Sequence, residues 1–301
     1  MIEKRNLKIR SAGKINLYLN VTKNGRNDGY HDIKSIMQSI GLADELSFEI
    51  SLLDNGYNNI VITSDNVEMP LDEKNLVHKA ACILLNRHGL YDKYKISINI
   101  KKYIPVCAGL AGGSTNAAAT LVALNHLLKL KMDKEELIQI ASEIGSDVPF
   151  CLAGGTALAE GRGEIISQLA DIPFYWVILA KNGKKFKTKD VYNKFDYYGK
   201  EKISIHGNLI RKIEAGQYDS FFKKLYNDLE EIGLLKDLNI KKIKNKAKEM
   251  GAIVSQMTGS GPTVFALCQD LEAAKKIYTA LKPLASQVFL THTKSNSLSF
   301  I

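Results

Sequence analysis

The sequence is poor in the residues that mark several common protein classes. Its 301 residues include only four cysteines, with no CxxC pair and no histidine at zinc-finger spacing: Cys82, Cys107, Cys151 and Cys268. This scarcity excludes a zinc ribbon or a disulfide-stapled scaffold and predicts buried free thiols. No window approaches the roughly 18 uncharged apolar residues of a membrane-spanning helix, and residues 1–5 lack the apolar segment of a signal peptide. We therefore expect a cytoplasmic protein with no membrane partner.

What is present is the composition of a globular protein. Hydrophobic residues make up 45% and charged residues 24% of the chain, a balance that favours a packed core over disorder. A chain of 301 residues exceeds what one ordinary core holds, so two domains are expected. Glycines are dense at positions 154–163 and an apolar run follows, which predicts a boundary at residue 157 and domains of residues 1–157 and 158–301.

The net charge of +9 is compatible with a nucleic acid, a membrane surface or an anionic small molecule, because a positive field concentrates all three. Much of the excess lies in residues 181–189 and 236–248. Such lysine runs are typical of solvated loop and helix faces. We therefore predict no nucleic-acid partner.

Periodicity predicts strands and helices without strict alternation, which favours an α+β architecture over a doubly wound parallel sheet. The expected strands are residues 7–21, 44–52, 95–100 and 174–179, with a strand pair around Gly259–Gly261. The expected helices are residues 75–87, 116–128, 133–144, 207–215, 221–231 and 240–250. Asp133 with Glu136 forms the pattern of a capping box, and Gly145 ends that helix.

The most informative stretch is a glycine-rich loop that leads directly into a helix. It consists of Pro105, Val106, Cys107, Ala108, Gly109, Leu110, Ala111, Gly112, Gly113, Ser114 and Thr115. Glycines let backbone N–H groups approach an anion, and the N-terminus of the following helix favours negative charge. The loop lacks the Gly-Lys-Ser/Thr ending of a Walker A motif and the strand–GxGxxG context of a dinucleotide fingerprint. From the residues alone, the alternative is an ordinary glycine turn in which Ser114 caps a helix.

The pattern Pro-x-x-x-Gly-Leu-x-Gly-Gly-Ser-Ser/Thr resembles the phosphate loop of the GHMP kinases. Further blocks resemble the branch that phosphorylates 4-diphosphocytidyl-2-C-methyl-D-erythritol. In chain order they are residues 11–19 (SAGKINLYL), 28–31 (DGYH), 145–150 (GSDVPF), 227–230 (NDLE) and 257–265 (MTGSGPTVF). They span nearly the whole chain in the family's order. Ala12-Gly13 stands where the family usually has Pro-Ala, and Ala111 replaces a frequent glycine.

The resemblance implies a two-domain GHMP kinase fold, with an N-terminal ATP-binding domain, a C-terminal substrate domain and a cleft between them. It also implies ATP as co-substrate and phosphorylation of the 2-hydroxyl of the methylerythritol unit, a step of the non-mevalonate route to isoprenoid precursors. Magnesium follows from the need to offset phosphate charge, although no side chain can be named as its ligand. The sequence does not indicate an oligomeric state.

By the same resemblance, Asp147 is the general base and Lys14 its partner, which keeps the carboxylate ionised and faces the developing charge. Local sequence alone favours other roles for both. Asp147 stands between Ser146 and Val148-Pro149, a typical helix cap, and an isolated lysine in a strand is usually solvated.

For the substrate, the resemblance implies binding by Asn16, Tyr30, His31, Thr188 and Tyr192, with the two tyrosines closing on a flat base. Spacing alone equally allows a turn aromatic at Tyr30, a structural histidine at His31 and a core residue at Tyr192. The loop of residues 258–261 is either a backbone nest for a phosphate or a plain turn. Two rival functions remain: a kinase for another small alcohol such as homoserine, and a silent nucleotide or nucleic-acid binder.

Overall fold

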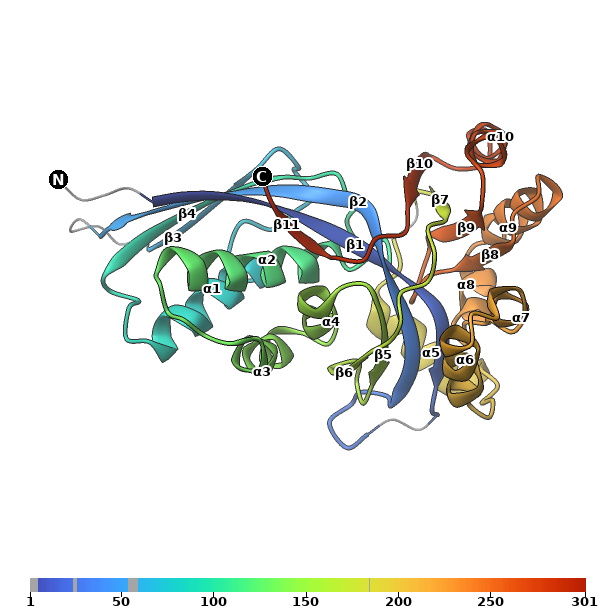
Figure 1. Cartoon of the computed structure of the whole chain (residues 1–301), viewed down its shortest axis with the longest axis horizontal. Coiled ribbons are helices and arrows are strands. Elements are labelled where there is room, and N and C mark those ends of the chain that lie inside the picture. The colour runs from blue at the N-terminus through green and yellow to red at the C-terminus, as the bar shows by residue number, and fades with distance from the viewer. Residues whose placement is uncertain (1–4, 24–25, 54–58, 184) are drawn as a thin grey trace.

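The computed structural model describes residues 5–23, 26–53, 59–183 and 185–301 (Figure 1). Residues 1–4, on which the signal-peptide prediction partly rests, lie outside the described residues, as does Lys184 of the basic run. No helix in the described ranges is long and apolar enough to cross a membrane.

The N-terminal half is built on an antiparallel sheet with one parallel edge. Its strands run in the order β11-β1-β2-β4-β3, and β5 and β6 extend it as a hairpin from β2. The bounds are β1 (Arg5–Val21), β2 (Ile33–Leu52), β3 (Ile60–Ser64), β4 (Tyr94–Lys101), β5 (Thr156–Glu160), β6 (Ile165–Gln168) and β11 (Leu298–Phe300).

Helices cover one face of this sheet, as Figure 1 shows. They are α1 (Leu76–Arg87), α2 (Gly112–Leu127), α3 (Lys134–Ile144) and α4 (Val148–Ala153). The side chains between them and the sheet form one apolar core. The sequence signals at the helix ends are confirmed: Asn75 caps α1, the Asp133–Glu136 capping box opens α3, and Gly145 ends it.

The C-terminal half holds a second sheet of order β10-β7-β9-β8. Its strands are β7 (Trp176–Lys181), β8 (Val254–Met257), β9 (Val264–Cys268) and β10 (Gln287–His292). Its helices are α5 (Thr188–Tyr198), α6 (His206–Glu214), α7 (Tyr218–Phe222), α8 (Glu230–Lys236), α9 (Asn239–Glu249) and α10 (Leu271–Leu281). An apolar cluster packs β7 and β9 against α5, α8, α9 and α10. The α+β expectation is confirmed.

The long strand β1 connects the two halves. Its residues from Ser11 to Val21 are all buried, and Ile15 and Leu17 belong to a cluster that also contains Phe265 of the second sheet. The last strand, β11, returns to pair with β1, and residue 157 falls inside β5. The division into residues 1–157 and 158–301 stays a prediction.

The predicted helix of residues 221–231 is wrong. The chain forms α7 and α8 with a break between them, and the break pairs with β1. Leu19 donates its N–H to Tyr226 O at 3.0 Å and accepts from Asp228 N at 2.9 Å. These long-range hydrogen bonds satisfy the backbone better than an isolated helix would, and a local pattern does not reveal them.

The prediction of buried thiols is only half right. All four cysteines are free, and Cys151 and Cys268 are buried, but Cys82 is half-buried and Cys107 is exposed. Cys107 is exposed because it lies in the glycine-rich loop rather than in a core element.

Candidate active site

The glycine-rich loop runs from the end of β4 into α2 and packs against a second glycine turn. Gly109 adopts φ +76°, and a Cβ placed on it would lie 2.6 Å from the carbonyl oxygen of Thr258. The Lys14 N–H donates to Leu110 O at 3.1 Å, which fixes the loop to β1. Two segments far apart in sequence therefore meet at Gly109, where no side chain fits.

The helix after the loop begins earlier than predicted, at Gly112 rather than at residue 116. Gly112, Gly113 and Ser114 form its first turn, and among the described residues their N–H groups donate no backbone hydrogen bond. The first turn carries no acidic residue. Free N–H groups at a helix N-terminus are suited to bind phosphate. The alternative of a Ser114 cap does not hold, because Ala111 is the N-cap and its side chain donates and accepts nothing.

Ala111 has φ +56° and ψ +29°, the left-handed conformation that disfavours alanine. Ala111, which replaces a frequent glycine of the family's loop, therefore stands at a strained position. The strain of about 1 kcal/mol is held in place by the packing on either side of the loop.

A buried ion pair anchors the start of the loop. Asp44 Oδ2 lies 2.5 Å from Lys102 Nζ, and both side chains are almost fully buried. Asp44 Oδ1 also accepts the N–H groups of Tyr103 and Ile104, each at 2.8 Å. Burial lowers the pKa of Lys102, and the charge of Asp44 opposes this shift. The pair thus fixes the backbone immediately before Pro105.

Lys14 and Asp147 lie together beside this loop. Lys14 Nζ is 3.6 Å from Asp147 Oδ2 and donates to Asn16 Oδ1 at 2.7 Å. The Lys14 side chain is 5% exposed, whereas that of Asp147 is 33% exposed. A buried ammonium therefore faces a carboxylate that a substrate can reach. The register of β1 against β2 shifts between Ala12 and Lys14. Such a β-bulge bends the strand locally, next to Lys14.

The structure does not support a solvated strand lysine at Lys14 or a capping side chain at Asp147. Lys14 is buried rather than solvated. Asp147 does occupy the N-cap position of α4, but its side chain makes no capping hydrogen bond. Its carboxylate is instead directed at Lys14.

The turn of residues 258–261 is buried and completes this corner. Asn16 N donates to Thr258 Oγ1 at 3.0 Å, and a Cβ on Gly259 would lie 3.6 Å from Lys14 Nζ. Asn227 Nδ2 donates to the carbonyl oxygens of Met257 and Gly259, both at 2.8 Å. Asn227 therefore holds the turn in place.

His31 and Tyr192 form a ring pair next to the ionic pair. Their ring centroids are 5.0 Å apart, and His31 Nε2 lies 2.8 Å from Asp196 Oδ1. Burial, followed by the charge of Asp147, raises the pKa of the Tyr192 hydroxyl. This hydroxyl therefore stays neutral and lies within electrostatic reach of Asp147.

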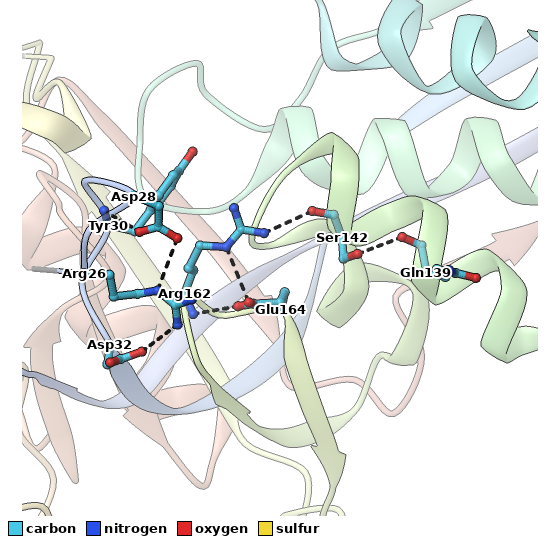
Figure 2. A network of polar contacts seen from close by, with 8 residues as sticks. All are labelled: Arg26, Asp28, Tyr30, Asp32, Gln139, Ser142, Arg162 and Glu164. Atoms are coloured by element: carbon cyan, nitrogen blue, oxygen red, sulfur yellow. Dashed lines mark hydrogen bonds and ion pairs between the residues drawn. The ribbon is translucent and has the colours of Figure 1, made fainter.

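Tyr30 lies at the rim, in the polar network of Figure 2. Its side chain is 49% exposed, and the guanidinium of Arg162 lies 5.0 Å from its ring centroid. Arg162 in turn contacts Glu164 and Ser142 O. Among the described residues Tyr30 has no aromatic partner, so the structure does not bring it against Tyr192. Thr188, also exposed, lies 3.2 Å from Ser260 Oγ.

The described residues include no group of three His, Cys, Asp or Glu side chains that could hold a metal. A site for magnesium must therefore take most of its ligands from elsewhere. Magnesium normally keeps waters and nucleotide phosphates and takes one or two protein oxygens. Ser114 offers such an oxygen in the first turn of α2, beside the free N–H groups.

Sequence reasoning missed the positioning residues Asp44, Lys102, Thr258 and Asn227. Asp44 lies within β2 and Lys102 directly follows β4, each beside a second charge of the same sign, and nothing local shows that they pair. Asn227 and Thr258 did carry a signal, since both stand in the blocks NDLE and MTGSGPTVF, but their contacts appear only in the folded chain.

Comparisons with known proteins agree with this geometry. The model "GHMP kinases N terminal domain" matches residues 75–155, and "GHMP kinases C terminal" matches residues 209–284. The chain is 40% identical over 291 residues to a 4-diphosphocytidyl-2-C-methyl-D-erythritol kinase from Listeria innocua, with 97% of each chain covered.

Solved structures agree as well. A crystal structure of a 4-(cytidine 5'-diphospho)-2C-methyl-D-erythritol kinase superimposes with a TM-score of 0.74 at 26% identity, covering 97% of this chain and 99% of that one. A homoserine kinase from Cytophaga hutchinsonii gives a TM-score of 0.77 at 22% identity, covering 98% of this chain and 97% of that one, a likeness of fold alone. The chain belongs to the 4-diphosphocytidyl-2-C-methyl-D-erythritol kinase family of the GHMP kinases, which use ATP.

Proposed function

We propose that the chain transfers the γ-phosphate of ATP to the 2-hydroxyl of 4-diphosphocytidyl-2-C-methyl-D-erythritol. The observation that carries this proposal is the approach of Lys14 Nζ to Asp147 Oδ2, 3.6 Å apart, beside a loop with free N–H groups. Phosphoryl transfer needs an aligned acceptor, charge compensation and a proton acceptor. These three requirements are met by groups that lie together.

In the proposed reaction the 2-hydroxyl oxygen forms a bond to the γ-phosphorus while the bond from that phosphorus to the β–γ bridging oxygen breaks. Asp147 accepts the hydroxyl proton, and ADP leaves. Lys14 keeps Asp147 ionised and faces the charge on the transferred group. Because this charge is large and the transition state loose, alignment and electrostatics contribute more than proton abstraction.

The loop from Pro105 to Thr115 binds the ATP phosphates in this proposal. The N–H groups of Gly112, Gly113 and Ser114 are available for them, and Asp44 with Lys102 holds the loop in shape. Magnesium would arrive with ATP and offset the phosphate charge, with the Ser114 hydroxyl in the first turn of α2 as a protein contact. Within the described residues no cluster of three His, Cys, Asp or Glu side chains forms a resident metal site, and a metal that arrives with the nucleotide fits this arrangement.

The cytidine group binds at the aromatic side of the site. Tyr192 and His31 offer a ring pair near Asp147, while Tyr30 offers an exposed ring at the rim. Asn16 orients Lys14, and Thr188 adds a hydroxyl beside Ser260. We assign these five residues to the substrate. On binding, the Tyr30 ring leaves the Arg162 guanidinium and stacks on the cytosine base.

The test is a mass measurement of the product. Protein, ATP and magnesium are incubated in parallel with the cytidylyl methylerythritol, with free methylerythritol and with homoserine. We expect one added phosphoryl group on the cytidine-bearing alcohol only. Phosphorylation of homoserine alone would favour the rival small-alcohol kinase. Binding of ATP without transfer to any alcohol would favour a silent nucleotide binder.

A further inference from the structure

The sequence predicted a solvated face for the basic run of residues 181–189, but the run is not uniformly exposed. Lys187 and Lys189 are exposed, but Lys181, the last residue of β7, retains only 6% of its accessible surface. The prediction of a solvated face is therefore wrong at Lys181. The reason is topological: Lys181 pairs with Gln287 of β10 and lies inside the sheet.

Lys181 differs from the other buried lysines in having no partner. Lys14 reaches Asn16 and Asp147, and Lys102 reaches Asp44. Within the described part of the chain, no hydrogen bond or ion pair involves Lys181 Nζ, and this atom is not among the fully enclosed polar atoms that lack a partner. A lysine whose side chain is almost buried while its ammonium stays open and unpaired is costly to keep for stability alone. An anionic ligand would supply the missing partner.

The segment that follows Lys181 packs onto the glycine turn of the active site. The ring of Phe186 lies 3.3 Å from the Cβ position of Gly261, and Gly261 O lies 3.3 Å from that of Gly109. The segment therefore contacts the turn of residues 258–261, and this turn contacts the phosphate loop at Gly109. Lys185 Nζ adds a contact of 2.9 Å to Glu68 Oε1, in the segment before α1.

Strand pairing places Lys181 at the same corner, because the preceding residue, Ala180, pairs with Val264 of β9, which follows the turn of residues 258–261. The charges of Glu68 and of Cys107, a residue of the phosphate loop, act to raise the pKa of Lys181. Burial is the largest cause that lowers the pKa of Lys181, and the positive charge of Lys185 acts in the same direction. A bound polyphosphate would offset both effects.

We propose that Lys181 is a nucleotide-binding residue whose ammonium contacts the phosphates of ATP from the second sheet, facing the glycine-rich loop. The exposed Glu68–Lys185 ion pair connects the basic segment to the N-terminal half. This inference rests on the proposed function, since it takes ATP as the ligand. It assigns a role to one residue of the basic run that composition alone treats as surface.

The test compares two neutral variants with a matched control. Lys181→Met and Lys181→Gln remove the buried charge, and Lys189→Met removes an exposed charge from the same run. Affinities for MgADP and for adenosine are measured by titration calorimetry. A charge-assisted contact to phosphate predicts an ADP affinity lowered about tenfold or more in both Lys181 variants. Adenosine affinity should be unchanged, and Lys189→Met should stay within about twofold of wild type for both ligands.

Thermal unfolding of the ligand-free protein separates this role from a structural one. Removal of an unpartnered buried charge should leave the melting temperature of Lys181→Met unchanged or raise it. A lower melting temperature with unchanged ADP affinity would overturn the inference, as would an equal loss of ADP and adenosine binding. Wild-type protein that binds neither ligand would instead overturn the proposed kinase function, and the inference with it.

Discussion

Replacement of Asp147 by asparagine removes the proposed base while it preserves the size of the side chain. General-base catalysis contributes about 10²- to 10⁴-fold, so kcat should fall within that range. The affinity for ATP should change less than about threefold, because the phosphates bind at the loop. A loss of ATP affinity as large as the loss of kcat would show that Asp147 does not serve catalysis separately from ATP binding.

The cost in stability follows from the ion pair. At 3.6 Å and an effective dielectric constant near 20, the gross attraction between Lys14 and Asp147 is about 5 kcal/mol. Asp147 is one-third exposed, so water replaces much of this attraction, and Lys14 keeps Asn16 as a partner. We expect the free energy of unfolding to fall by only about 1–2 kcal/mol.

The assay combines steady-state kinetics with denaturant unfolding for Asp147→Asn, Lys14→Met and the double variant. Because the two groups act as a unit, the double variant should lose little more activity than the worse single variant. The exposed Asp92 supplies the control Asp92→Asn, which should match wild type. Full additivity of the two losses, or a kcat for Asp147→Asn within tenfold of wild type, would refute the reasoning.

Three further predictions concern the supports of the site and the pH dependence of stability. Gly109→Ala should cost about 2–4 kcal/mol, because a left-handed φ and a clash with Thr258 O coincide; a denaturant midpoint equal to that of wild type would contradict this. Asp44→Ala leaves Lys102 buried and unpaired and should cost about 3–5 kcal/mol, measured in the same way, whereas a loss below 1 kcal/mol would show that the pair is not needed. Burial lowers the pKa of His206 from its ordinary value of 6.5, so the unfolded chain binds the proton more readily. Above pH 6.5 His206 is neutral in both states and does not affect stability. As pH falls below that value, protonation of the unfolded chain lowers the free energy of unfolding. His206→Gln should reduce this dependence of the melting temperature on pH.

How much the sequence could predict depended on whether a signal was local. The Asn75 cap and the Asp133–Glu136 box are satisfied within one helical turn, and both appear in the structure. The left-handed φ of Ala111 was not predicted, because the sequence showed only that alanine replaces a frequent glycine there. The break at Asn227 could not be anticipated in this way, because its partners are Leu19 of β1 and the carbonyl oxygens of Met257 and Gly259, all far away in sequence.

The candidate site was predictable only where its residues belong to recognisable blocks. Lys14 and Asp147 were named through the resemblance, since periodicity alone favoured a solvated lysine and a helix cap. Their mutual approach depends on how β1 crosses the N-terminus of α4, which no local pattern contains. Lys181 was misplaced for the same reason, because its burial results from pairing with β10.

The most direct test of the central claim is a crystal structure with magnesium, a non-hydrolysable ATP analogue and 4-diphosphocytidyl-2-C-methyl-D-erythritol. We predict that the 2-hydroxyl oxygen lies within about 2.6–3.2 Å of Asp147 and faces Lys14, with phosphate oxygens on the N–H groups of Gly112 and Gly113. Phosphates bound away from α2, or a 2-hydroxyl remote from Asp147, would contradict the account.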